Sequence, residues 1–272
     1  MLRRPVLPPL LLFLSSLSGA CAIPGDAAWS DLHSTLQAGG IDSSASGSIT
    51  ANLAGTFPDV GSGSLELPEE DASSRYLAGR LGFAPLEFVF SDFSHQSTHK
   101  SSLDFPALNA SGDFETQLDL SVQKLLLGFD LVNTPVSRVG VLLGVDFLEF
   151  NNFEIALANP PAGYSGQSSY PLVSDQTLPV PLLGLRGDVL LPGTGLRAGG
   201  EVCGFYLSDL EDLDKMEYLD VDLNLSWSRG NWLEWTLGYR QIGFDLEGAI
   251  EGETLTADIE VSGPYLNFGV IW

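Results

Sequence analysis

Apolar and polar residues alternate along most of this chain, with the period of two that is typical of β-strands. In residues 218–228, for example, Leu219, Leu223 and Trp227 share one face, and Asp220 and Asp222 share the other. Tracing this alternation back from the C-terminal residues, we predict ten strands, at about 46–57, 74–83, 86–96, 113–131, 138–157, 178–191, 195–208, 216–229, 231–248 and 254–272.

The links between these strands are alternately short and long. Short links occur at 84–85, 133–137, 192–194 and 229–230, and longer polar links separate the other strand pairs. Short turns at one end and long loops at the other are typical of antiparallel barrels that span a membrane. The polar faces also carry small residues, as expected where a narrow lumen leaves little room: Gly140, Gly144, Gly184, Gly199, Gly238 and Gly269.

We therefore predict an all-β fold, a closed antiparallel up-and-down transmembrane β-barrel of about ten strands, with eight or twelve as alternatives. In such a barrel the apolar face of each strand meets lipid and the polar face lines the lumen. A secreted β-sandwich, with the apolar face turned inward, would give the same alternation and remains an alternative.

The first 22 residues have the pattern of a secretory signal peptide. Arg3 and Arg4 precede a short apolar run at Leu10–Leu14, and Ala20-Cys21-Ala22 offers a cleavage site. Lipoprotein processing at Cys21 is a second reading of this segment. The expected organisation is a signal peptide at 1–22, a flexible periplasmic leader at 23–45 and an outer-membrane barrel at 46–272.

Composition narrows the classes of partner. The chain has a net charge of −23, and residues 1–22 hold two of its 12 basic and none of its 35 acidic residues, so the remainder is near −25. This charge argues against a nucleic-acid partner. Only Cys203 remains after residue 22, so no internal disulfide is expected.

The C-terminal residues carry the most specific signal. Leu266, Phe268, Val270 and Trp272 share one face of a strand that ends on an aromatic residue. With the strand pattern, this ending resembles the small outer-membrane β-barrel proteins of Gram-negative bacteria, the broad OmpA-barrel and OmpW-like group. The resemblance implies export to the outer membrane, insertion by the barrel-assembly machinery through the last strand, and surroundings of outer-membrane lipid and lipopolysaccharide.

Aromatic residues gather near one turn and near the chain end. On neighbouring strands they would form an interfacial belt at the periplasmic rim, where amphipathic rings are favoured. The predicted members are Trp227, Trp232, Trp235, Tyr239 and Trp272.

The lumen faces carry a predicted charge network. Its members are Asp146, Arg186, Asp188, Arg197, Glu201, Asp220, Asp222, Glu234 and Arg240. One interpretation is a pathway for cations or other small solutes. The interpretation we favour is a salt-bridged plug, because barrels of about this size are filled by their own side chains. The predicted role is structural or that of a minor passive conduit, without catalysis.

One short motif suggests an enzyme instead. His95 and Ser97 lie two residues apart on a strand, which resembles the His-x-Ser pair of outer-membrane lipid A deacylases, although Thr98 stands where that family has asparagine. A lipid A or phospholipid esterase is therefore an alternative function. The acidic runs at 66–71 and 209–214 do not match a calcium-binding loop, and we predict no cofactor and no metal site.

Overall fold

The computed structural model describes residues 33–52, 62–105, 110–159, 169–210, 213–229, 232–250 and 253–272. The predicted signal peptide lies outside them. No helix of this part of the chain is long and apolar enough to cross a membrane. Its strands are β1 (His33–Asn52), β2 (Ser62–Phe83), β3 (Leu86–Phe105), β4 (Ala110–Asn133), β5 (Ser137–Asn159), β6 (Ser169–Leu191), β7 (Leu196–Leu210), β8 (Leu213–Arg229), β9 (Leu233–Ile250) and β10 (Glu253–Ile271).

These strands form one closed ring. Each pairs with the next in antiparallel fashion, and β1 pairs with β10. Reciprocal backbone hydrogen bonds between Ser34 and Trp272, of 3.2 and 3.1 Å, complete the ring at the C-terminal residue. The predicted ten-stranded, closed, up-and-down barrel is confirmed. A β-sandwich is not the fold, because Leu223 and Leu237 point outward and are 55% and 57% exposed.

An apolar belt surrounds the half of the barrel nearer the short turns. In this half the alternation places large apolar side chains on the outside and polar ones inside, as predicted. The belt has an exposed member on each of β2 to β10: Leu77, Phe88, Leu125, Leu143, Leu183, Val202, Leu219, Leu237 and Leu266.

Beyond the belt the two faces exchange their character. On β4, Leu125 points outward, whereas Val122, Leu120 and Leu118 point inward and are buried. Along the sequence, the main apolar positions change from even-numbered to odd-numbered residues between Val122 and Leu127. However, β3 and β4 pair there without a register shift. The strand continues without interruption, and its apolar side chains lie on the outer face in the belt and on the inner face beyond it.

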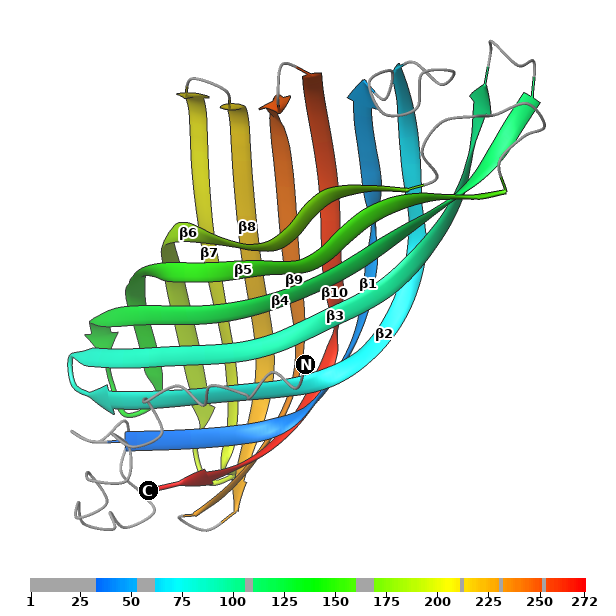
Figure 1. The fold of residues 1–272 in the computed structure, drawn as a ribbon. Coiled ribbons are helices and arrows are strands. Elements are labelled where there is room, and N and C mark those ends of the chain that lie inside the picture. Colours follow the sequence, from blue (N-terminus) through cyan, green and yellow to red (C-terminus); the bar gives the residue numbers. More distant parts are fainter. Residues whose placement is uncertain are drawn as a thin grey trace.

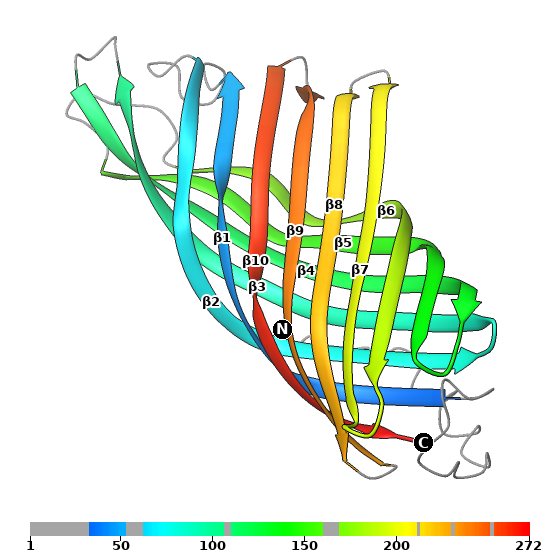
Figure 2. The ribbon, with the colours of Figure 1, turned by 180° about the vertical axis from the view of Figure 1, so that it is seen from behind.

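The far half of the barrel is divided into two sheets by two seams. β2 pairs with β3 only from Tyr76 to Phe83, and β6 pairs with β7 only from Leu183 to Leu191. Beyond these pairs, β7–β10, β1 and β2 rise side by side while β3–β6 run across them (Figures 1 and 2). An outer apolar core fills this half; it includes Ile41, Ile49, Leu118, Leu120, Leu148, Phe153, Val180, Met216, Ile242 and Ile259.

The predicted leader at 23–45 requires a correction. Residues 33–45 belong to β1 and pair with both β2 and β10, so the first strand begins well before residue 46. Small residues conceal this strand in the sequence. They are there for close packing, because a Cβ on Gly39 would overlap the backbone oxygen of Leu266.

Several strands are also longer than predicted. β2 begins at Ser62 rather than near residue 74, and β3 continues to Phe105 rather than ending near 96. These extensions lie beyond the belt. Their outer faces are polar, so the sequence there reads as loop.

The outer faces of the extensions are strongly acidic. Asp258 on β10 lies directly opposite Asp245 on β9, and like charges in this arrangement repel. We expect Asp258→Asn to raise the unfolding free energy by about 0.5 kcal/mol at low salt, and by less at high salt. Urea titrations at two salt concentrations would measure this. Glu260→Gln is the matched control, since Glu260 lies opposite Gly243; an equal gain there would contradict the explanation.

Candidate functional site

The predicted lumen charges lie inside the barrel. They occupy the half nearer the short turns, up to the point where the outer apolar core begins. Eight of the nine predicted residues are buried, and the side chain of Arg197 is 25% exposed. The alternation therefore placed each of them on the inner face.

The first cluster lies near the short turns and centres on two arginines. Arg186 binds both Glu87 and Asp130, the latter at 2.5 Å. Arg138 contacts Asp188 through Nε and Nη2, at 3.2 and 3.0 Å, and reaches Glu87 at 3.1 Å. Three carboxylates from β3, β4 and β6 thus neutralise two guanidinium groups from β5 and β6.

The second cluster is centred on Asp220 of β8. Its carboxylate accepts hydrogen bonds from Arg240 Nε and Nη2, at 3.2 and 2.7 Å, and lies 2.6 Å from the Lys124 ammonium. Lys124 also contacts Glu201 at 3.2 Å, and Arg240 donates to Ser91 at 2.9 Å. Charges buried in this way are stable only when paired with good geometry, which this cluster provides.

Two further carboxylates are held by tyrosines. Tyr218 donates to Asp146 at 2.6 Å, and Tyr265 donates to Asp222 at 2.8 Å. Tyr76 also lies 3.4 Å from Asp222. Among the residues that the structure describes, no cation forms an ion pair with either carboxylate, and the phenol groups supply the hydrogen bonds instead.

The sequence analysis missed several members of these clusters. The alternation of inward polar residues with outward apolar residues identifies all of them. Glu87 precedes outward Phe88, and Lys124 and Asp130 alternate with Leu125 and Phe129 on β4. Arg138 stands next to Val139 in the same way, and Arg80 reaches Glu201 at 3.5 Å. Six of the chain's 12 basic residues thus converge inside the barrel: Arg80, Lys124, Arg138, Arg186, Arg197 and Arg240.

Glycines make room for these side chains. A Cβ on Gly128 would overlap the Arg186 guanidinium, and one on Gly238 would overlap the Tyr265 ring. Contacts between strands four apart in the ring, such as Lys124 of β4 with Asp220 of β8 and Arg240 of β9 with Ser91 of β3, show that the lumen is narrow.

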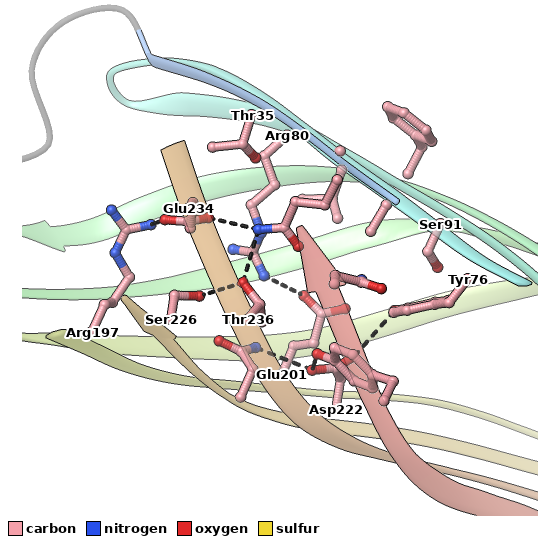
Figure 3. A pocket seen from close by; sticks show the side chains of 18 of the residues that line it. Thr35, Tyr76, Arg80, Ser91, Arg197, Glu201, Asp222, Ser226, Glu234 and Thr236 are labelled. Carbon is pink, nitrogen blue, oxygen red and sulfur yellow. Dashed lines mark hydrogen bonds and ion pairs between the residues drawn. The ribbon is translucent and has the colours of Figure 1, made fainter. Parts of the chain in front are cut away.

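A small polar cavity of about 50 Å³ remains between the clusters. Figure 3 shows Arg80 directed at Glu201, and Arg197 at Glu234, across this space. Asn267 lines it, and neither of its buried amide atoms has a partner among the described residues. A polar cavity of this size holds about four waters, so it is a pocket for solvent rather than for a large solute.

The predicted aromatic belt and assembly signal lie on the outer surface. Trp227, Trp232, Trp235 and Trp272 are exposed at the short-turn end, and the Trp235 ring packs edge-on against Phe268 at 4.6 Å. Tyr239 is also exposed but lies further along β9, opposite Leu223, and so not at the rim. The residues of the predicted assembly signal point outward, three on β10 and the last just after it: Leu266, Phe268, Val270 and Trp272.

The His-x-Ser motif lies at the β2/β3 seam, inside the barrel and beyond the apolar belt. Ser43 contacts His95 Nδ1 at 2.9 Å, and Ser97 Oγ lies 2.8 Å from Nε2 of both His95 and His99. His99 Nδ1 lies 2.8 Å from the backbone oxygen of Pro68. This hydrogen-bonded chain, which we call the seam relay, links β1, β2 and β3 where the backbone pairing of β2 and β3 has ended.

One hydrogen-bond direction in the relay is fixed by its last member. The Pro68 oxygen only accepts, so His99 donates to it from Nδ1. Ser97 Oγ lies between the Nε2 atoms of His95 and His99, and Ser43 Oγ contacts both His95 Nδ1 and, at 3.3 Å, the backbone oxygen of Ala72. Burial, which disfavours the charged ring, and to a smaller extent nearby His99 together lower the pKa of His95 to about 4, against the opposing effect of Asp71.

No group of three or more His, Cys, Asp or Glu side chains in the described ranges is arranged to hold a metal ion. None of the protein-family models matches the chain, and no curated protein does.

Solved structures do match. The outer membrane protease OmpT from Escherichia coli aligns with a TM-score of 0.53 and 11% identity, over 89% of this chain and 96% of that one. A FadL homologue from Pseudomonas aeruginosa aligns at 0.33 and 9%, over 89% and 90%. The translocator domain of the autotransporter NalP from Neisseria meningitidis aligns at 0.35 and 14%, over 85% and 86%.

The OmpT match shows a shared fold. This chain therefore has the fold of an outer-membrane β-barrel protein. At this identity the match says nothing of activity, and it does not single out the OmpA-barrel and OmpW-like group.

Proposed function

We propose that this protein is an integral outer-membrane β-barrel whose lumen is sealed, with a structural role in the envelope and at most minor passive conduction. The observation that carries this proposal is the succession of two closed layers along the barrel axis. Paired charges fill the lumen inside the belt, and the outer apolar core fills the space beyond it. An ion that passed the first layer would have to leave water to cross the second.

The proposed orientation follows from the lengths of the links. In bacterial barrels the short turns generally face the periplasm, so the two-sheet half of this barrel projects to the other side of the membrane. The belt then meets outer-membrane lipid, and the acidic outer half stands at the level of lipopolysaccharide. Insertion by the barrel-assembly machinery would use Leu266, Phe268, Val270 and Trp272.

The seal is tested by electrical recording. We expect the folded protein in planar lipid bilayers to give no discrete conductance steps, because no continuous water column crosses the outer apolar core. An open porin reconstituted in the same way is the positive control. Reproducible single-channel steps from protein that shows heat-modifiable migration on a gel would overturn the sealed-lumen proposal and favour the small-solute channel.

A second candidate function is hydrolysis of a lipid ester by Ser97. The favouring observation is that Ser97 Oγ lies 2.8 Å from His99 Nε2, while His99 Nδ1 is oriented by the Pro68 oxygen. This is the arrangement of a nucleophile, a base and an orienting acceptor. His95 and His99 are fully buried, so a substrate would reach Ser97 only if the seam parted. Fatty-acid release from radiolabelled lipid that is lost in Ser97→Ala would support it; no release by the unaltered protein would exclude it.

A further inference from the structure

The β6/β7 seam starts at the edge of the apolar belt. The last pair between these strands joins Leu183 to Gly204, while β6 remains paired with β5 as far as Ser169. On the outer surface beside this point, Leu183 is 69% and Tyr206 62% exposed. The seam therefore opens next to apolar surface that the proposed location places in lipid.

Two prolines keep the seam open. Pro179 and Pro181 lie on β6 just beyond Leu183, and the pairing of β6 with β5 continues past both of them. Proline has no N–H to donate, so strands accommodate it on an unpaired side. The edge of β6 that faces β7 thus lacks two donors that a ladder would need.

Where the strands part, inward apolar side chains become partly exposed. Leu178 of β6 and Phe205 and Leu207 of β7 are half-buried against the outer apolar core. Leu246 of β9 is also half-buried. Met216 of β8 pairs with Leu207 on one side and with Leu246 on the other, so the three side chains lie in one row across the sheet. We call Leu178, Phe205, Leu207 and Leu246 the seam shelf.

The seam shelf continues the belt. Phe205 pairs with Tyr218, and the next residue of β8, Leu219, points outward as a belt member. Leu219 and Tyr206 lie on the outer face and Phe205 on the inner face, so a hydrocarbon chain on Tyr206 reaches the shelf by passing the edge of β7 beyond Gly204, where the pairing with β6 has ended. It needs no polar partner to enter.

We propose that the seam shelf binds a hydrocarbon chain of an outer-leaflet lipid, which enters between β6 and β7 from the apolar belt. An extended peptide is a poorer occupant, because a peptide binds a sheet edge through backbone hydrogen bonds and Pro179 and Pro181 remove donors from this edge. The inference rests on the proposed location in an outer membrane. It goes beyond the sealed-lumen function, since the chain would enter laterally and not cross the barrel.

Site-specific photocrosslinking tests this inference in the full-length protein. Separate variants carry benzoylphenylalanine at Phe205 or Leu207 on the shelf, at Leu219 on the belt, and at Ile242 in the closed core. Each is folded into vesicles of palmitoyl-oleoyl phosphatidylethanolamine and phosphatidylglycerol, checked by heat-modifiable migration, irradiated and weighed intact by mass spectrometry. We expect phospholipid adducts at Leu219 and at a shelf position in yields within about threefold of each other, and at least about tenfold less at buried Ile242.

The outcomes separate the two proposals. Adducts at Leu219 but at neither shelf position would overturn the shelf and leave membrane embedding intact, whereas no adduct at Leu219 would overturn the proposed location itself. Shelf adducts to protein rather than to lipid would also overturn the inference. In Pro179→Val/Pro181→Val, which restores the missing donors, the shelf yield should fall about fivefold as β6 pairs with β7, while the Leu219 yield stays unchanged.

Discussion

Asp220→Asn is expected to lower the unfolding free energy by about 3–5 kcal/mol. The carboxylate of Asp220 is fully buried and neutralises Lys124 and Arg240 together. Asparagine has nearly the same shape but no charge, so it leaves two buried cations with one fewer anion between them. The cost arises mainly from these uncompensated charges rather than from the lost hydrogen bonds.

Urea unfolding in detergent micelles would measure this difference, with Asp245→Asn as the matched control. Asp245 also contacts a lysine, Lys215 at 2.5 Å, but that pair is about one-third exposed. Water and salt screen such a pair, so its loss should cost far less than the loss of the Asp220 carboxylate. Equal effects of the two substitutions would refute the view that the lumen cluster is a desolvated, mutually dependent network.

Acidification is expected to destabilise the outer half of the barrel through His95. In the unfolded chain His95 takes up a proton near its ordinary pKa of 6.5, whereas in the folded protein its pKa is lowered to about 4. The unfolded state therefore binds more protons between these values, so stability falls as pH decreases from 6.5 to 4. The shift corresponds to a loss of roughly 3 kcal/mol at the acid end of this window.

Many carboxylates titrate in the same range, so the test compares two proteins. At neutral pH the unfolding free energy of His95→Asn should be lower than that of the unaltered protein, because the seam relay is broken. On acidification it should fall by less than in the unaltered protein. Unfolding titrations at several pH values between 4 and 7.5 would show the two curves converging. Parallel curves would rule out His95 as the group that titrates.

The comparison of sequence and structure is clearest on β4. From Leu125 to Leu131 the alternation predicts the outward face correctly, because there the outside is apolar and the inside is charged. From Phe114 to Val122 the apolar residues occupy the opposite face. Alternation reports which residues share a face, but it does not report which solvent that face meets.

The interior illustrates the same limit. Every predicted lumen charge lies inside, since the faces of its strand were assigned correctly, and Glu87, Lys124 and Arg138 follow from the same rule. Their pairing did not follow, because Arg138 meets Asp188 across neighbouring strands while Arg186 of β6 meets Glu87 of β3, three strands away. Such partners depend on strand register and barrel width, which are properties of the assembled sheet.

The motif at His95 and Ser97 was visible in the sequence, but its other partners were not. Ser43 lies on β1, in the segment read as a leader, and the Pro68 oxygen lies in a stretch read as a loop. Only the three-dimensional arrangement shows a relay across a seam in place of an isolated pair.

The amino-acid sequence alone determined the number of strands, their order and the set of residues on each face, because these depend on local alternation and on the lengths of links. The tertiary structure decided where the outer face stops being apolar, where the barrel divides into two sheets and which buried charges meet. Those features depend on contacts between residues far apart in the chain, whose energies no local pattern records.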